Sequence, residues 1–111
     1  MNTIDWSDFE KTDIRVGTIL SAKELLKARK PAYVLEIDFG ELGIKTSSAQ
    51  ITSHYQLNEI IGKQIIAVIN FPPKRIAGFK SECLVMGVYD ENSDVVLLSL
   101  DKKVKNGLKI G

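Results

Sequence analysis

Basic side chains gather in two stretches of this sequence, and the chemistry they could perform is the binding of anions. Residues 23–33 hold four basic residues against one acidic residue, and residues 70–82 hold three against one. The chain as a whole has a formal net charge of only +1, so the rest of it is acidic in balance. If the fold brings the two stretches together, they form a local anion-binding surface. The alternative is that two solvated loops happen to be basic.

The residues that usually perform catalysis are scarce. His54 is the only histidine and Cys83 the only cysteine, which excludes a histidine pair for a metal and an intrachain disulfide. We expect His54 to lie on the surface of a helix and Cys83 to be an unreactive, buried thiol within a strand. Spacing alone leaves a Cys83–His54 nucleophile pair open, although no neighbouring residue supports one. The sequence therefore predicts a binding protein that is not an enzyme and uses no metal or cofactor.

Length and composition indicate one globular domain. The chain has 111 residues, of which 44% are hydrophobic and 26% charged. No apolar run reaches the roughly 20 residues of a membrane span, and no signal peptide is visible at the start. We therefore expect a cytoplasmic protein without membrane insertion.

The first half of the chain reads as three strands and a helix. In residues 13–23 the β-branched positions 14, 16 and 18 share one face, residues 33–39 alternate apolar and polar positions, and residues 44–50 return after a turn at residues 40–43. Gly17 predicts a bulge or a sharp bend in the first strand. Thr52 and Ser53 could cap a helix that ends at Ile61, before Gly62.

The segments before and after these elements are predicted from similar patterns. Ser7 followed by Glu10 fits the capping box of a short N-terminal helix. The apolar run within residues 63–70 predicts a strand buried on both faces, and residues 71–81 a long loop. Residues 82–90 and 95–100 read as further strands on either side of a turn.

The order of these elements predicts the fold class. Three strands, a helix and two further strands is the order of the OB-fold, a five-stranded Greek-key barrel. We therefore expect an all-β domain with a small helical component over residues 1–111, with its barrel at about residues 13–90 and extensions at residues 1–12 and 91–111. Ligands of this barrel meet the loops between strands 1 and 2 and between strands 4 and 5. Those loops are the two basic stretches.

Several segments resemble the tRNA-binding domain family, which occurs in tRNA synthetases and in free-standing tRNA-binding proteins. The resemblance covers about residues 13–87 and includes Asp13-Ile-Arg-Val-Gly-Thr-Ile19, Gly62-Lys63 and Asn70-x-x-Pro-Lys-Arg-x-x-Gly-x-x-Ser81. Within that family, residues 28–33, 47–52 and 70–82 are similar to the CsaA-type export-related chaperones. Glu82 departs from the family pattern, since an amide is more usual there, and an acid beside the loop would repel phosphate.

The resemblance implies partners as well as a fold. It implies a homodimer whose interface is built by the two extensions, and binding of unfolded or precursor polypeptides, with the Sec export motor as a partner. It also implies a tRNA-binding surface. Two functions follow: a non-enzymatic chaperone for protein export, which we favour, and a tRNA-binding factor that recognises structured RNA through loops 23–33 and 70–82.

The resemblance also implies site residues for each ligand. For tRNA they are Arg29, Lys30, Lys74, Arg75 and Lys80 on phosphates, with hydrogen bonds from Asn70 and Ser81. For a polypeptide, an apolar surface within the basic frame would come from Phe71, Pro72, Ile76 and Phe79. The alternative for the two phenylalanines is that they pack the loop onto the end of the barrel.

Overall fold

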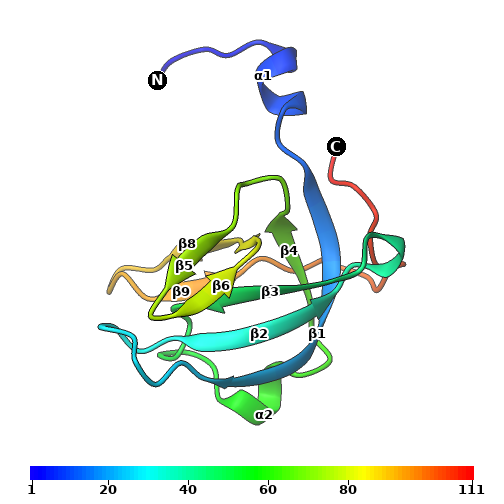
Figure 1. Ribbon diagram of the computed structural model, residues 1–111. Coiled ribbons are helices and arrows are strands. Elements are labelled where there is room, and N and C mark those ends of the chain that lie inside the picture. The colour runs from blue at the N-terminus through cyan, green and yellow to red at the C-terminus, as the bar shows by residue number, and fades with distance from the viewer.

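The computed structural model describes all 111 residues, and five of its strands build one curved antiparallel sheet (Figure 1). The strand order is β3-β2-β1-β4-β7. The bounds are Ile14–Glu24 for β1, Tyr33–Asp38 for β2, Ile44–Ala49 for β3, Gln64–Val68 for β4 and Leu84–Val85 for β7. This nearly closed five-stranded barrel, with two small helices, confirms the predicted OB-fold.

The barrel is closed by residues 81–83, which run beside β3. The backbone N–H of Glu82 donates to the carbonyl of Thr46 at 2.8 Å, and the Ser47 hydroxyl donates to the carbonyl of Cys83 at 3.0 Å. The core lies inside, with Leu35 and Ile37 of β2 fully buried and Glu36 between them exposed. β4 is buried on both faces, as its unbroken apolar run predicted.

Gly17 does not form the predicted bulge. The register of β1 on β2 shifts between Ile19 and Ser21 instead. A Cβ atom on Gly17 would lie 2.6 Å from Ile37 Cγ2 and 2.7 Å from Phe39 Cε1. The glycine is therefore needed because two core side chains pack directly on its backbone.

Both helices differ from their predicted bounds. α1 spans Trp6–Glu10, and its capping pair is Asp5 with Asp8, not Ser7 with Glu10. The backbone N–H of Asp5 donates to the Asp8 carboxylate at 3.2 Å. The helix thus begins before Ser7, because an acidic capping pair is available two residues earlier.

α2 is only Leu57–Ile60, so the helix predicted from residue 52 to residue 61 is mostly wrong. Tyr55 explains the late start. Its carbonyl accepts a hydrogen bond from the Tyr33 hydroxyl, and its own hydroxyl accepts one from the backbone N–H of Leu97. These two bonds connect Tyr55 to β2 and to the segment of Leu97, in a non-helical conformation. Gly62, with φ of +90°, ends the segment as expected.

The segment predicted as a long loop contains a hairpin. β5 spans Lys74–Ile76 and β6 spans Phe79–Ser81, with Ala77 and Gly78 at the turn, both at positive φ. The strand expected over residues 82–90 is divided into β7 and β8, which spans Gly87–Tyr89. β8 pairs with β9, Val95–Leu97, in a second hairpin.

Residues 107–110 lie along the first half of β1. The Val16 backbone N–H donates to the carbonyl of Leu108 and the Val16 carbonyl accepts from the N–H of Gly107, while the Ile14 carbonyl accepts from the N–H of Ile110. Where this tail passes the turn after β2, a Cβ on Gly107 would lie 2.5 Å from the carbonyl oxygen of Phe39. The second extension is therefore packed on its own barrel.

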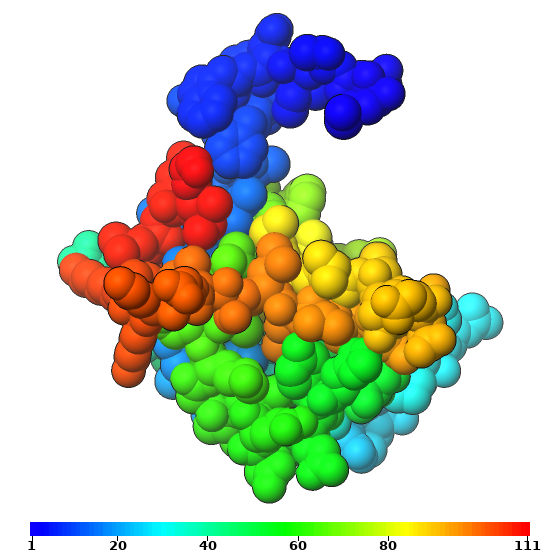
Figure 2. All heavy atoms as spheres, turned by 180° about the vertical axis from the view of Figure 1, so that it is seen from behind, coloured from blue at the N-terminus to red at the C-terminus, as the bar shows by residue number.

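The first extension is not packed in this way. α1 buries none of its residues, and Figures 1 and 2 show the N-terminal segment standing off the barrel as an arm. Trp6 is 66% exposed, and its ring meets that of Phe9 at 5.3 Å between centroids. Neither helix, of five and four residues, is long enough to cross a membrane.

Candidate functional site

The two basic stretches meet in space and form the walls of one groove. Arg29 and Lys30 line it from the loop between β1 and β2, and Lys74 and Ile76 line it from β5. The groove has a volume of about 760 Å³. The predicted juxtaposition of the region around Arg29 with the region around Lys74 is confirmed.

The groove combines positive charge with an apolar floor. Ten of its sixteen lining residues are hydrophobic, and none is acidic. Its four basic residues are Lys27, Arg29, Lys30 and Lys74, and none of them makes an ion pair within the chain. Such a surface can hold an extended ligand with apolar side chains, or a flat aromatic base beside a phosphate.

The predicted basic residues of the β5–β6 hairpin divide between its two faces. Lys74 and Ile76 face the groove, whereas Arg75, which pairs with Lys80 across the hairpin, lies on the opposite face. Arg75 also donates to the carbonyl of Gly78 at 3.3 Å and so supports its own turn. The groove therefore receives one of the three cations predicted from this hairpin.

Asn70 is engaged within the chain. Its Oδ1 accepts a hydrogen bond from the backbone N–H of Asp13 at 2.9 Å, and its Nδ2 donates to the carbonyl of Lys11 at 2.7 Å. Both ends of the amide thus hold the linker between α1 and β1. Both polar ends of Asn70 are therefore occupied within the chain, and its hydrogen bonds to tRNA remain a prediction.

Ser81 and Glu82 attach the hairpin to β3. The Ser81 hydroxyl accepts from the backbone N–H of Ser48 at 3.1 Å. Glu82 Oε1 accepts from both the backbone N–H and the hydroxyl of Thr46, each at 2.9 Å. These bonds, the backbone N–H first, lower the pKa of the Glu82 carboxyl. Glu82 therefore does not line the groove as a repelling acid, because its charge is used to close the barrel.

The barrel closure should depend on pH. Because the folded pKa of Glu82 lies below its ordinary value of 4.5, its stabilisation is complete above that value and is lost as the pH falls through the lowered pKa. We expect Glu82→Gln to reduce the urea midpoint at pH 7 and to reduce it much less at pH 3. Glu10→Gln, at an exposed residue without a hydrogen bond, is the control and should change neither midpoint. An equal deficit of Glu82→Gln at both pH values would contradict this role.

The four residues predicted for polypeptide binding are only partly gathered. Ile76 lies in the groove. Phe79 is half-buried in a neighbouring depression beside Leu25 and Leu26 of the first basic loop. Phe71 is 52% exposed, and it precedes the hairpin together with the exposed Pro72. Phe79 is thus partly covered by the first basic loop and Phe71 is not, and neither is among the residues packed against the barrel core.

Part of the groove comes from the β7–β9 region, which the sequence did not indicate. Leu84, Tyr89 and Val95 line the groove, and Tyr89 is 77% exposed. In an extended chain the odd positions of residues 83–89 lie on one face. This pattern could have suggested Tyr89 but not Leu84. Nothing local shows that this face meets the loop of Arg29.

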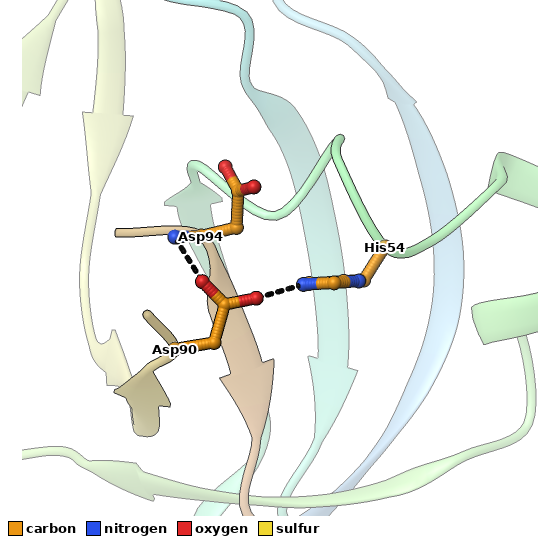
Figure 3. Close-up of side chains that lie close together, drawn as sticks. All are labelled: His54, Asp90 and Asp94. Atoms are coloured by element: carbon orange, nitrogen blue, oxygen red, sulfur yellow. Dashed lines mark hydrogen bonds and ion pairs between the residues drawn. The ribbon is translucent and has the colours of Figure 1, made fainter. Parts of the chain in front are cut away.

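His54 lies in a turn before α2, where it joins this turn to the β8–β9 hairpin (Figure 3). Its Nε2 is 2.6 Å from Asp90 Oδ2, and Asp90 Oδ1 accepts from the backbone N–H of Asp94 at 3.0 Å. The Asp94 bond, and then the His54 bond, lower the pKa of Asp90. With Asp94 these side chains could ligate a cation, since their ligand atoms lie within 4.8 Å. The hydrogen bond between His54 and Asp90 already explains their arrangement, because it connects the two segments.

Cys83 is buried, as predicted, although it lies between β6 and β7 and not within a strand. Burial raises the pKa of its thiol to about 11. The thiol faces the carbonyl of Thr46, while His54 bonds Asp90. The two side chains therefore do not form a nucleophile pair.

Comparison with protein families gives one match over most of the chain. Residues 14–109 match the family described as "Putative tRNA binding domain". The methionine–tRNA ligase of Methanocaldococcus jannaschii is 33% identical over 110 residues, which are 99% of this chain and 17% of that protein. The chain thus spans about a sixth of the length of this relative.

Solved structures of similar length also match. The chaperone CsaA of Bacillus anthracis is 55% identical with a TM-score of 0.94, over 99% of this chain and 100% of that one. The CsaA chaperone protein of Picrophilus torridus is 50% identical with a TM-score of 0.91, over 98% and 100%.

Proposed function

Because the chain belongs to the tRNA-binding domain family, we propose that it uses the ligand face of this barrel as a CsaA-like chaperone for unfolded or precursor polypeptides. The observation that carries this proposal is the groove itself, with an apolar floor between Ile76 and Tyr89 and unpaired cations along its rim. Unfolded and precursor polypeptides expose apolar segments, which the floor of the groove can contact, and their acidic residues can pair with the cations of its rim. Such a role lies in the cytoplasm and upstream of the Sec export motor, without enzymatic activity.

A binding experiment tests this function. We expect a labelled precursor peptide to bind the full chain, and an equimolar amount of the protein to suppress aggregation of a denatured client. Ile76→Ser with Tyr89→Ser should weaken peptide binding by about tenfold, because both apolar contacts are lost. Leu42→Ser with Ile44→Ser, at exposed apolar residues outside the groove, is the matched control. Absence of both peptide binding and aggregation suppression would refute the chaperone proposal.

A second function is favoured by the charge of the same groove. Lys27, Arg29, Lys30 and Lys74 are unpaired, and no acid lines the surface, which suits the phosphates of structured RNA. We propose tRNA binding as the alternative activity. Titrating labelled tRNA and labelled peptide side by side at fixed salt, with competition, distinguishes one shared site from two. Binding of tRNA that does not weaken with salt, or no binding at low salt, would remove this alternative.

We also propose a homodimer built on the N-terminal arm. The arm exposes Ile4 and Trp6, and the β8–β9 hairpin exposes Val88 and Val96. Exposed apolar surface on both elements is typical of a protein–protein interface, and a second copy of the chain would bury it. Light scattering should give twice the 12.3 kDa of one chain.

Charges on the arm should prevent this association. We expect Ile4→Asp with Trp6→Asp to give the monomer mass, because two carboxylates would have to be buried at the interface. Leu42→Asp with Ile44→Asp places the same charges on exposed apolar residues outside the arm and should leave the mass doubled. A wild-type chain that elutes as a monomer would contradict the proposal.

A further inference from the structure

A second cavity lies where the β9 strand and the segment after it border α2 and the start of β4, at the junction of the orange and green spheres in Figure 2. Its volume is about 320 Å³, and it shares no lining residue with the groove. It is lined by Tyr55, Gly62, Lys63, Gln64, Ile65, Leu97, Ser99, Leu100, Lys102 and Lys103.

The charged groups of this cavity are all cations. Lys63, Lys102 and Lys103 make no ion pair, and no lining residue is acidic. The Tyr55 hydroxyl accepts from the backbone N–H of Leu97, so its own proton remains available. The backbone N–H groups of residues 99–103 donate to no acceptor within the chain. Three ammonium groups beside free hydroxyl and amide donors favour an anion.

Gln64 does not weaken this charge preference. Its amide nitrogen donates to the carbonyl of Val104 at 2.6 Å and to Asn106 Oδ1 at 3.0 Å. Its carbonyl oxygen accepts from the N–H of Val104 at 3.1 Å. The side chain is therefore used to hold the segment that forms one wall, and it offers no free acceptor to a ligand.

The apolar part of the lining restricts the kind of anion. Ile65, Leu97 and Leu100, together with the ring of Tyr55, supply apolar surface that inorganic phosphate would leave uncovered. The volume is at the lower end of small-molecule sites, at about 300–1,000 Å³, and is too small for a peptide of several residues. A phosphate attached to one flat organic group satisfies both conditions.

We propose that this cavity binds a single nucleotide unit, with the phosphate at Lys63, Lys102 and Lys103 and the base against the apolar wall. The nucleotide could be free or part of a single-stranded RNA, and both sources share this chemistry. The site is separate from the groove, so its failure would leave the function proposed for the groove unaffected.

The test is a titration of the full ¹⁵N-labelled chain with adenosine 5′-monophosphate, followed by the amide resonances of residues 62–65 and 97–103. We expect these resonances to shift, and adenosine without phosphate to shift them far less. Lys102→Ala with Lys103→Ala should weaken the affinity by about tenfold, because two ion pairs to the phosphate are lost. Lys105→Ala removes a lysine from the same segment but outside the cavity and should leave the affinity within about twofold. The spectra of the variants show directly that each remains folded.

Competition separates the two sources of the nucleotide. If a short oligoadenylate displaces the mononucleotide from these resonances, the site takes nucleotides within RNA, and if it does not, the site takes free nucleotides. Either result supports the proposal. Equal shifts with adenosine, equal losses in Lys105→Ala and in the double variant, or shifts confined to the groove would overturn it.

Discussion

Replacing Arg29 and Lys74 by glutamate is expected to abolish most tRNA binding. These residues come from different basic loops and face one groove in which no acid lies. Reversing both charges changes the groove from attractive to repulsive for phosphate, and we expect the affinity to fall by about a hundredfold at physiological salt. Neutral replacements of the same two residues should reduce the slope of log affinity against log salt by about two.

The hairpin supplies a matched control for this prediction. Arg75→Glu with Lys80→Glu makes the same change in charge on the face turned away from the groove. Because this change reduces only the long-range attraction between the chain and tRNA, we expect the affinity for tRNA to fall by no more than about tenfold. Titrations at several salt concentrations measure both effects. Equal losses in the two double variants would show that tRNA does not select the groove face.

Phe39→Ala should cost the largest amount of stability among single side-chain deletions. Phe39 is 0% exposed, and its ring packs on the backbone of Gly17 at the centre of the barrel. Removing the ring leaves a cavity in the core, because the surrounding structure relaxes only partly. We expect the free energy of unfolding to fall by about 3–5 kcal/mol. Urea denaturation monitored by circular dichroism measures this loss.

Phe71→Ala is the matched control because the same side chain is 52% exposed there. We expect it to change the free energy of unfolding by no more than about 0.5 kcal/mol. Comparable losses in both variants would mean that Phe39 is not a principal core residue. The pair also separates stability from ligand binding, since only Phe71 lies where a polypeptide could contact it.

The barrel could be predicted because its strands carry local patterns. The second half of β2 alternates buried and more exposed positions, and β4 is a short apolar run bounded by Gly62 and Pro72. These patterns fix the order of the elements, and that order alone places loops 23–33 and 70–82 together. The groove was therefore predictable in position before any contact was known.

The differences from the predictions arise from an unusual turn residue and from contacts between distant residues. The turn of the β5–β6 hairpin uses Ala77 at φ of 51°, where asparagine or glycine is the usual signal, so the segment reads as a loop. Tyr55 shortens α2 through bonds to Tyr33 and Leu97, which no local pattern encodes. Asn70 and Ser81 suited a ligand by residue type, but the amide and the hydroxyl are used to hold the barrel and its linker.

The position of residues 107–110 along β1 has a consequence for synthesis of the protein. The backbone groups of Ile14 and Val16 that face this segment find their partners only in residues translated more than ninety positions later. During translation the backbone hydrogen bonds on one side of β1 therefore remain unmade while the other strands leave the ribosome. We expect a nascent chain that is stalled before residue 107 to remain protease-sensitive at β1 and to become resistant only once Gly107 to Ile110 have emerged.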